Sequence, residues 1–268
     1  YPPAPCRACG ETTADGWPSA AGGAAPWWCR RCWEPWLGAG AARPGPGARP
    51  PVFVLGLPKC GTTSLQRALE SAGYGAVHCY APKPWGPLPE DRFVGHLMRK
   101  AVEQGLAPLA LLPRWVNAVT QMDCWWLDWE PGETGRPPGG ELQRAHGIFP
   151  QMALLDELDR AYPDAKFILN VRDPREWLRS VESYGPLRQI LAEAELPGLP
   201  RGAGAEDEKL LEWFEAHAAR VRRHFAGREG SALLEIALED DDAATSQRLE
   251  DFLGVPLEWG HHNVTTWA

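Results

Sequence analysis

The sequence has no long hydrophobic run and no excess of positive charge. Its 268 residues carry 27 Lys and Arg against 35 Asp and Glu, a formal net charge of −8. The longest apolar runs, near 52–57 and 165–171, have the length of strands and fall short of the roughly 18 residues of a membrane helix. General binding to nucleic acid or to an anionic membrane depends on surplus Lys and Arg. We therefore expect a soluble chain with no membrane span and no nucleic-acid partner, while a small phosphate-bearing ligand needs only a few local cations.

Cysteine is scarce except near the N-terminus. Two CxxC pairs with 19 residues between them stand in the first 36 residues: Cys6, Cys9, Cys29 and Cys32. This spacing is typical of a four-thiolate zinc site, which would be structural because no coordination position stays open for chemistry. Two disulfides are the alternative in a secreted chain. The same segment ends in an aromatic cluster that is a candidate surface for a protein partner: Trp27, Trp28, Trp33 and Trp36.

Composition divides the chain into three parts. Residues 1–36 are predicted to form the zinc-ribbon-like module, and residues 37–51 are a Gly/Ala/Pro linker that cannot bury a core. Residues 52–268 then form the main domain. The CxxC pairs favour a reducing compartment, whereas the Golgi would fit if an anchor had preceded Tyr1, so the sequence leaves the localisation open.

Strand and helix patterns alternate through the main domain. Short apolar runs predict strands at 52–57, 75–80, 118–121, 165–171 and 231–238. Helical spacing predicts helices at 62–73, 90–105, 149–163, 173–184, 207–225 and 243–254. Residues 125–147 are rich in Gly, Pro and Trp and are predicted to be a long irregular insertion. This alternation predicts an α/β fold with a doubly wound parallel sheet flanked by helices.

The segment GLPKCGTTS, residues 56–64, lies directly between the first strand and the first helix. Backbone N–H groups of such a loop and the helix N-terminus can hold a phosphate, and Lys59 adds a mobile cation. The candidate ligand-binding residues are Pro58, Lys59, Cys60, Gly61, Thr62, Thr63 and Ser64. Lys59 precedes the second glycine, so the spacing differs from the nucleoside-triphosphate loop GxxxxGK[ST]. Cys60 is interpreted as a small filler, with a redox-sensitive thiol as the alternative.

A second phosphate-binding signal follows the strand at 165–171. Arg172 stands at the end of this strand, and Ser180 lies eight residues later in the next helix. A guanidinium can bind a phosphate with two N–H groups, and a hydroxyl two turns along the helix can reach the same group.

Together, the PKCGTTS loop and the stretch YPDAKFILNVRDPREWLRS (162–180) resemble sulfotransferases that use 3′-phosphoadenosine 5′-phosphosulfate (PAPS). The resemblance spans roughly residues 52–262 and implies a P-loop-like α/β fold that transfers a sulfuryl group from PAPS to a hydroxyl or amine. It further implies that the loop holds the 5′-phosphate, that Arg172 and Ser180 hold the 3′-phosphate, and that Lys59 neutralises charge on the bridging oxygen. No metal is needed for such a transfer.

Two residues are candidates for the base that takes the acceptor's proton. His78 follows the second predicted strand, and Asp123 follows the third, where related sulfotransferases often have an Asp. Either could be structural instead, and His146 is an outside candidate. The C-terminal GHHNVT segment (260–265) is interpreted as a surface tail, with the alternative that His261, His262 and Asn263 line the nucleotide cleft.

Two alternatives to the PAPS-dependent enzyme stay open. A P-loop nucleotide kinase is disfavoured by the position of Lys59 and by the lack of a clear acidic strand end for Mg²⁺. A non-catalytic subunit that serves as a structural or docking component would suit the zinc-ribbon-like module, since fold and donor binding do not by themselves prove turnover. The acceptor is not readable, because its specificity is expected to lie in the loops around 80–147 and 185–205.

Overall fold

The computed structural model describes residues 49–81, 93–127, 145–227 and 232–262. In the first 48 residues it describes only four short strands: β1 (Ala4–Pro5), β2 (Thr12–Thr13), β3 (Gly16–Trp17) and β4 (Trp28–Cys29). They pair antiparallel as β1 with β2 and β3 with β4. The side chains of the four N-terminal cysteines and the linker at 37–48 lie outside the described residues, so the zinc module stays a prediction.

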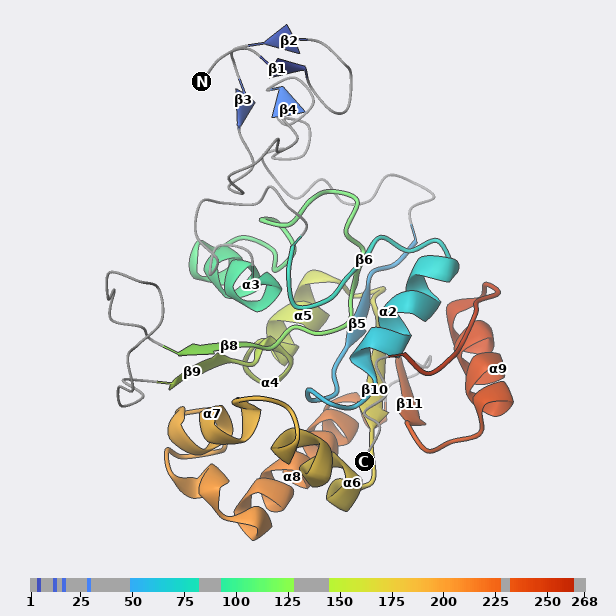
Figure 1. Cartoon of the computed structure of the whole chain (residues 1–268). Helices are drawn as coiled ribbons and strands as arrows, with labels where there is room; N and C mark the ends of the chain where they lie inside the picture. The colour runs from blue at the N-terminus through green and yellow to red at the C-terminus, as the bar shows by residue number, and fades with distance from the viewer. Residues whose placement is uncertain are drawn as a thin grey trace.

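Five parallel strands form the central sheet (Figure 1). In chain order they are β5 (Val52–Val54), β6 (Ala76–Val77), β7 (Ala118–Val119), β10 (Lys166–Val171) and β11 (Leu233–Ala237). Across the sheet the order is β11-β10-β5-β7-β6. Strand β5 is central, and the chain adds strands first on one side of it and later on the other. The predicted doubly wound parallel sheet is confirmed, and its switch point is the carboxyl end of β5.

Alternate residues of the strands supply the two faces of the sheet. Val52, Val54 and Ile168 belong to one apolar cluster, and Phe53 and Leu169 belong to another. The first cluster packs against α2 (Thr62–Ser71) and α9 (Asp242–Leu253). The second packs against α3 (Val94–Glu103), α5 (Leu155–Ala161) and α8 (Asp207–Phe225). Strands covered on both faces must be apolar throughout, which explains the uninterrupted runs in the sequence.

The predicted helices appear with small changes in their ends. Helix α6 (Pro174–Glu182) begins at the predicted cap, where the Asp173 carboxylate accepts hydrogen bonds from the backbone N–H groups of Arg175 and Glu176. Helix α9 ends at Gly254, which has a left-handed φ of 73°. The helix predicted at 149–163 is broken into α4 (Pro150–Ala153) and α5 at Leu154.

Two segments predicted to be irregular contain regular structure. The ends of the 125–147 insertion form an antiparallel pair of strands, β8 (Cys124–Leu127) and β9 (Ala145–Ile148). The predicted loop at 185–205 contains α7 (Leu187–Glu193) and a short 3₁₀ turn, η2 (Ala203–Ala205). Helix α7 is short but buries Leu187, Ile190 and Leu191, so its helical form depends on packing.

A third apolar cluster joins α6, α7 and α8 next to the strand–loop–helix at 52–71. Trp177 of α6 is fully buried in it and stacks on Phe214 of α8, with ring centroids 4.3 Å apart and an interplanar angle of 21°. Figure 1 shows these three helices together on the side of the sheet where β10 ends. Within the described ranges, no helix combines the length and apolar character needed to cross a membrane.

A matched pair of leucine truncations tests the core assignment. Leu169 of β10 is 1% exposed, whereas Leu106, after α3, is 41% exposed. We expect Leu169→Ala to lower the free energy of unfolding by about 2–5 kcal/mol, because it removes buried contacts and leaves a cavity. Leu106→Ala should lower it by less than about 1 kcal/mol. Chemical denaturation measures both values, and equal losses would contradict the burial of β10.

Candidate functional site

A cleft of about 350 Å³ lies at the carboxyl ends of the sheet strands. Its walls come from the segments that follow β5, β6, β7, β10 and β11. The lining residues are Pro58, Lys59, Gly61, Thr62, Thr63, Ser64, His78, Gln121, Trp125, Arg172, Glu176, Ser180, Tyr184, Leu238, Glu239, His261 and His262. Both predicted phosphate-binding segments therefore meet at one cleft, as expected for a ligand site at the switch point of a doubly wound sheet.

The loop between β5 and α2 has a tightly turned backbone. Gly61 is the N-cap of α2 and has a φ of 82°. Among the described residues, Lys59 is the only non-glycine residue with positive φ, at 73°. This conformation is unfavourable for a side chain and persists only where the surroundings impose it. The loop is thus held in one shape, with the first N–H groups of α2 without partners inside the helix.

Asn170 of β10 imposes that shape. Its side-chain Oδ1 accepts a hydrogen bond from the Gly56 N–H at 2.9 Å, and its Nδ2 donates to the Cys60 carbonyl at 2.7 Å. Asn170 is 1% exposed. A Cβ at Gly56 would lie 2.2 Å from the Asn170 backbone and side-chain oxygens, so only glycine fits there. Sequence reasoning missed Asn170, although an amide at the end of the apolar run KFILNV was a usable signal.

Trp177 supports the loop from the other side. Its indole Nε1 donates to the Pro58 carbonyl at 2.9 Å. Because Trp177 is fully buried, the hydrogen bond satisfies both groups away from water. Cys60, one residue beyond Lys59, is also buried, and burial raises the pKa of its thiol. Cys60 is not a cleft-lining residue, and its burial and raised thiol pKa fit a small filler better than a redox-sensitive thiol.

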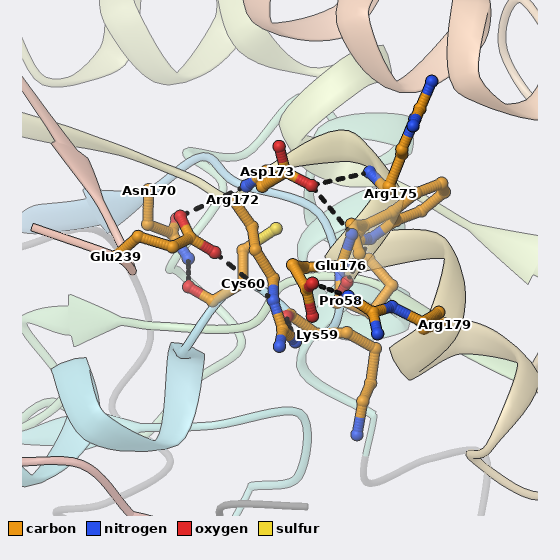
Figure 2. A network of polar contacts seen from close by, with 11 residues as sticks. Pro58, Lys59, Cys60, Asn170, Arg172, Asp173, Arg175, Glu176, Arg179 and Glu239 are labelled. Carbon is orange, nitrogen blue, oxygen red and sulfur yellow. Dashed lines mark hydrogen bonds and ion pairs between the residues drawn. The ribbon is translucent and has the colours of Figure 1, made fainter.

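Two cations face the cleft (Figure 2). The Lys59 ammonium lies 3.8 Å from the ring centroid of Tyr184, a cation–π contact. Burial, and next the charge of Arg172, lower the pKa of Lys59. Arg172 donates through Nη1 to the Lys59 carbonyl at 3.2 Å. Ser180, 1% exposed, lies on the same wall two turns into α6.

A chain of hydrogen bonds runs from the cleft into the interior. Thr62 Oγ1 is 2.9 Å from His78 Nε2 and donates to Gln121 Oε1 at 3.2 Å. The Gln121 Nε2 donates in turn to Asp123 Oδ2 at 2.9 Å. Gln151 donates to the other Asp123 oxygen, also at 2.9 Å. Because a carboxylate only accepts, it fixes the Gln121 amide with its oxygen toward Thr62.

The two candidate bases have different positions in this chain of hydrogen bonds. His78 lines the cleft, and burial lowers its pKa to about 4, so the imidazole is neutral near pH 7. Asp123 is 0% exposed and lies behind Gln121 rather than on the cleft wall. Burial raises the pKa of Asp123 to about 6, against the hydrogen bonds from Gln151 and Gln121. His146 lies in β9 and is not a cleft-lining residue.

The C-terminal segment returns to the cleft. His261 and His262 line it, and the backbone N–H of His262 donates to Ser64 Oγ at 2.9 Å. His261 and His262 are exposed, as in a surface tail, and they also line the cleft, which is the alternative that the sequence left open; Asn263 lies outside the described ranges. Sequence reasoning could not show this contact, because it joins residues 198 positions apart.

A family model described as "Sulfotransferase family" matches residues 50–259. The chain belongs to this family. A solved structure similar to this family member is the crystal structure of a sulfotransferase from Alicyclobacillus acidocaldarius. It has 17% sequence identity and a TM-score of 0.38, with 82% of this chain and 87% of that one covered. No curated protein matches the chain.

Among the residues that the structure describes, no group of three or more His, Cys, Asp or Glu side chains is arranged to hold a metal ion. The cleft instead presents two cations, several hydroxyls and the start of a helix, which together favour an anionic ligand.

The buried carboxyl of Asp123 should affect how stability depends on pH. Its pKa in the folded chain is about 6, above the ordinary value of 3.8. The folded state therefore holds this proton more tightly than the unfolded state, and the resulting stabilisation is lost as pH rises from about 4 through about 6. We expect wild type to lose up to about 3 kcal/mol relative to Asp123→Asn over that range.

Denaturation at several pH values measures this difference. The neutral histidines His78 and His217, whose pKa values burial lowers to about 4, titrate in both proteins and cancel in the comparison. Parallel pH profiles of the two proteins would contradict a raised pKa at Asp123.

Proposed function

We propose that this member of the sulfotransferase family moves a sulfuryl group from PAPS to a hydroxyl or amine acceptor. The observation that carries the proposal is that the loop at Pro58–Ser64 and the Arg172–Ser180 pair line the same cleft. One nucleotide with phosphates at both its 5′ and 3′ positions would use both segments. A ligand with a single phosphate would use only one of them.

Features of the cleft fit such a nucleotide. Among the described residues, the Nε of Arg172 is buried and has no hydrogen-bond partner. An unsatisfied buried N–H is unfavourable, and a phosphate oxygen would satisfy it. Gly61, the N-cap of α2, has no side chain and would let a phosphate approach the backbone closely there. The volume of about 350 Å³ lies in the range of small-molecule sites.

The protein's part in such a transfer is positioning and electrostatic stabilisation. PAPS, as substrate, supplies the sulfuryl group and leaves as 3′,5′-bisphosphoadenosine. Sulfuryl transfer parallels phosphoryl transfer, whose loose transition state is stabilised chiefly by fixed charges. Lys59 would neutralise charge on the bridging oxygen. Thr63, the backbone N–H of Thr62 and the other loop N–H groups would hold the 5′-phosphate, and Arg172 with Ser180 would hold the 3′-phosphate.

We further propose His78 as the group that takes the acceptor's proton. It is neutral near pH 7, lines the cleft and contacts Thr62 of the phosphate loop. Asp123 would act as a positioning residue, since its carboxylate orients Gln121, which in turn orients Thr62 and the His78 tautomer. If Gln121 Oε1 takes the Thr62 proton, His78 Nε2 donates to Thr62 and leaves Nδ1 unprotonated.

Titration with 3′,5′-bisphosphoadenosine tests donor binding. We expect saturable stabilisation of wild type, of about 2.7 kcal/mol when the free ligand reaches about 100 times its Kd. Lys59→Ala and Arg172→Ala should each weaken binding by at least about tenfold, because each removes a charge that faces a phosphate. Arg67→Ala is the matched control, since Arg67 is exposed on α2 and pairs with Glu70 outside the cleft.

The same titration separates the alternatives. Tight binding of ATP that depends on Mg²⁺ would favour a nucleotide kinase and contradict the proposal. No binding of bisphosphoadenosine by wild type would leave only the structural or docking subunit. Binding without release of bisphosphoadenosine from PAPS, across a panel of phenols, sugars and amines, would support a non-catalytic member.

Turnover tests the two roles of His78 and Asp123. With an acceptor found in that panel, we expect His78→Gln to lower kcat by about 10²–10⁴-fold, because an amide can bond to Thr62 but cannot take a proton. Binding of bisphosphoadenosine should change by less than about threefold. Asp123→Asn should lower kcat less than His78→Gln does. A larger loss for Asp123→Asn would reverse the assignment of the base.

A further inference from the structure

The carboxylate of Glu239 lies beside Arg172, the cation that the proposed function assigns to the 3′-phosphate. Glu239 follows β11 and lines the cleft. Its Oε2 accepts a hydrogen bond from the Asp173 N–H at 3.1 Å. Its Oε1 lies 3.6 Å from Arg172 Nε, an ion pair too long for a hydrogen bond. Figure 2 shows Arg172 between Glu239 and Lys59.

Arg172 is therefore only partly satisfied. Nη1 donates to the Lys59 carbonyl, and Nε is buried without a hydrogen-bond partner in the described part of the chain. A guanidinium binds an anion best through two parallel N–H groups. Glu239 brings a negative charge close to Arg172 but does not form two parallel hydrogen bonds with it. Its Oε2 instead accepts from the backbone N–H of Asp173. The carboxylate is a counter-ion for Arg172 but not its best ligand.

We propose that Glu239 is a specificity-determining residue that competes with the ligand's 3′-phosphate for Arg172 and weakens its binding. This inference rests on the proposed function. A phosphate carries a charge of about −1.5 to −2 and would enter beside a carboxylate that is already there. Like charges repel in a partly desolvated site. The ion pair is 18% exposed at Arg172 and 43% exposed at Glu239, so water screens it only in part.

The competition has a consequence for choice among nucleotides. A carboxylate accepts a hydrogen bond from a ribose hydroxyl, whereas an arginine accommodates a phosphate on the ribose. Glu239 and Arg172 therefore favour opposite substituents at one place in the cleft. With both present, a 3′-phosphate binds less tightly than Arg172 alone would allow. This favours release of the bisphosphate product, a step that often limits turnover.

The test compares two nucleotides by isothermal titration. We expect E239Q to bind 3′,5′-bisphosphoadenosine about tenfold more tightly than wild type, which corresponds to about 1.4 kcal/mol. Glutamine keeps the size and can still accept from the Asp173 N–H. Binding of 5′-AMP, which lacks the 3′-phosphate, should change by less than about twofold. The gain for the bisphosphate should also decrease as salt is raised.

A matched control separates a local effect from a change in net charge. Glu235 of β11 pairs with Arg222 at 2.6 Å and is not a cleft-lining residue. E235Q removes the same unit of charge and one ion pair to an arginine, so it should leave both affinities unchanged. E239A is measured beside E239Q, and denaturation of each free variant checks that it is folded.

A double-mutant cycle tests whether Glu239 acts through Arg172. We expect R172A to weaken bisphosphate binding and to reduce the gain from E239Q when the two are combined, because only the direct repulsion between Glu239 and the phosphate then remains. An equal gain in the R172A background would overturn the inference, because Glu239 would then act by general repulsion.

The outcomes distinguish this inference from the proposed function. If wild type binds the bisphosphate but E239Q binds it equally or less tightly, Glu239 is not a competitor, and donor binding stands. If E239Q and E235Q give the same gain, net charge explains the effect and the inference is overturned. If neither wild type nor any variant binds the bisphosphate, the proposed function fails and the inference fails with it.

Discussion

The hydrogen bonds of the Asn170 side chain are the constraint on which the rest of the site depends. One amide at the end of β10 holds the N–H of Gly56 and the carbonyl of Cys60, at the two ends of the phosphate loop. Arg172 follows two residues later, directly after the last residue of the strand. The separation between the loop and the arginine is therefore fixed by the sheet itself. Trp177 adds a third bond, to Pro58, from the helix that carries Ser180. A donor with two phosphates would meet a site that needs little reorganisation, which is the condition for electrostatic catalysis.

The buried carboxylate of Asp123 orients the polar side chains on one side of the cleft. Burial of a charge is unfavourable unless hydrogen bonds compensate for it. Here both oxygens are occupied by amide N–H groups, and this arrangement decides which end of Gln121 faces Thr62. A carboxyl that the sequence suggested as a base thus lies one residue behind Gln121, which lines the cleft. It influences the cleft through orientation, whereas His78, the other candidate base, lines the cleft itself and contacts Thr62.

The features that could be predicted from the sequence are those that depend on residues close together in the chain. The strand and helix on either side of the loop at 56–61, the strand at 165–171, the cap at Asp173 and the helix at 207–225 all follow from local pattern, and the structure has each of them. What the sequence could not predict depends on contacts between distant segments. Asn170 meets a loop 110 residues away, and His262 meets Ser64 across 198. Helix α7 was missed because its form depends on burial against other helices rather than on its own seven residues. The strand pair β8–β9 was missed for a similar reason, since its pattern is interrupted by the residues between the two strands.

The overall acidity of the chain and the cationic cleft are compatible because the balance of charge is local. Lys59 and Arg172 lie close enough that the charge of one lowers the pKa of the other, so the pair is costly without an anion. Glu239 relieves part of that repulsion, and the Tyr184 ring relieves another part beneath the Lys59 ammonium. A site with cations alone would hold a bisphosphate tightly and release it slowly. In a site whose own carboxylate offsets one cation, the free energy differs less between the empty and the filled state. Reversible occupancy by a highly charged ligand, rather than the tightest binding, is the property that this arrangement of residues favours.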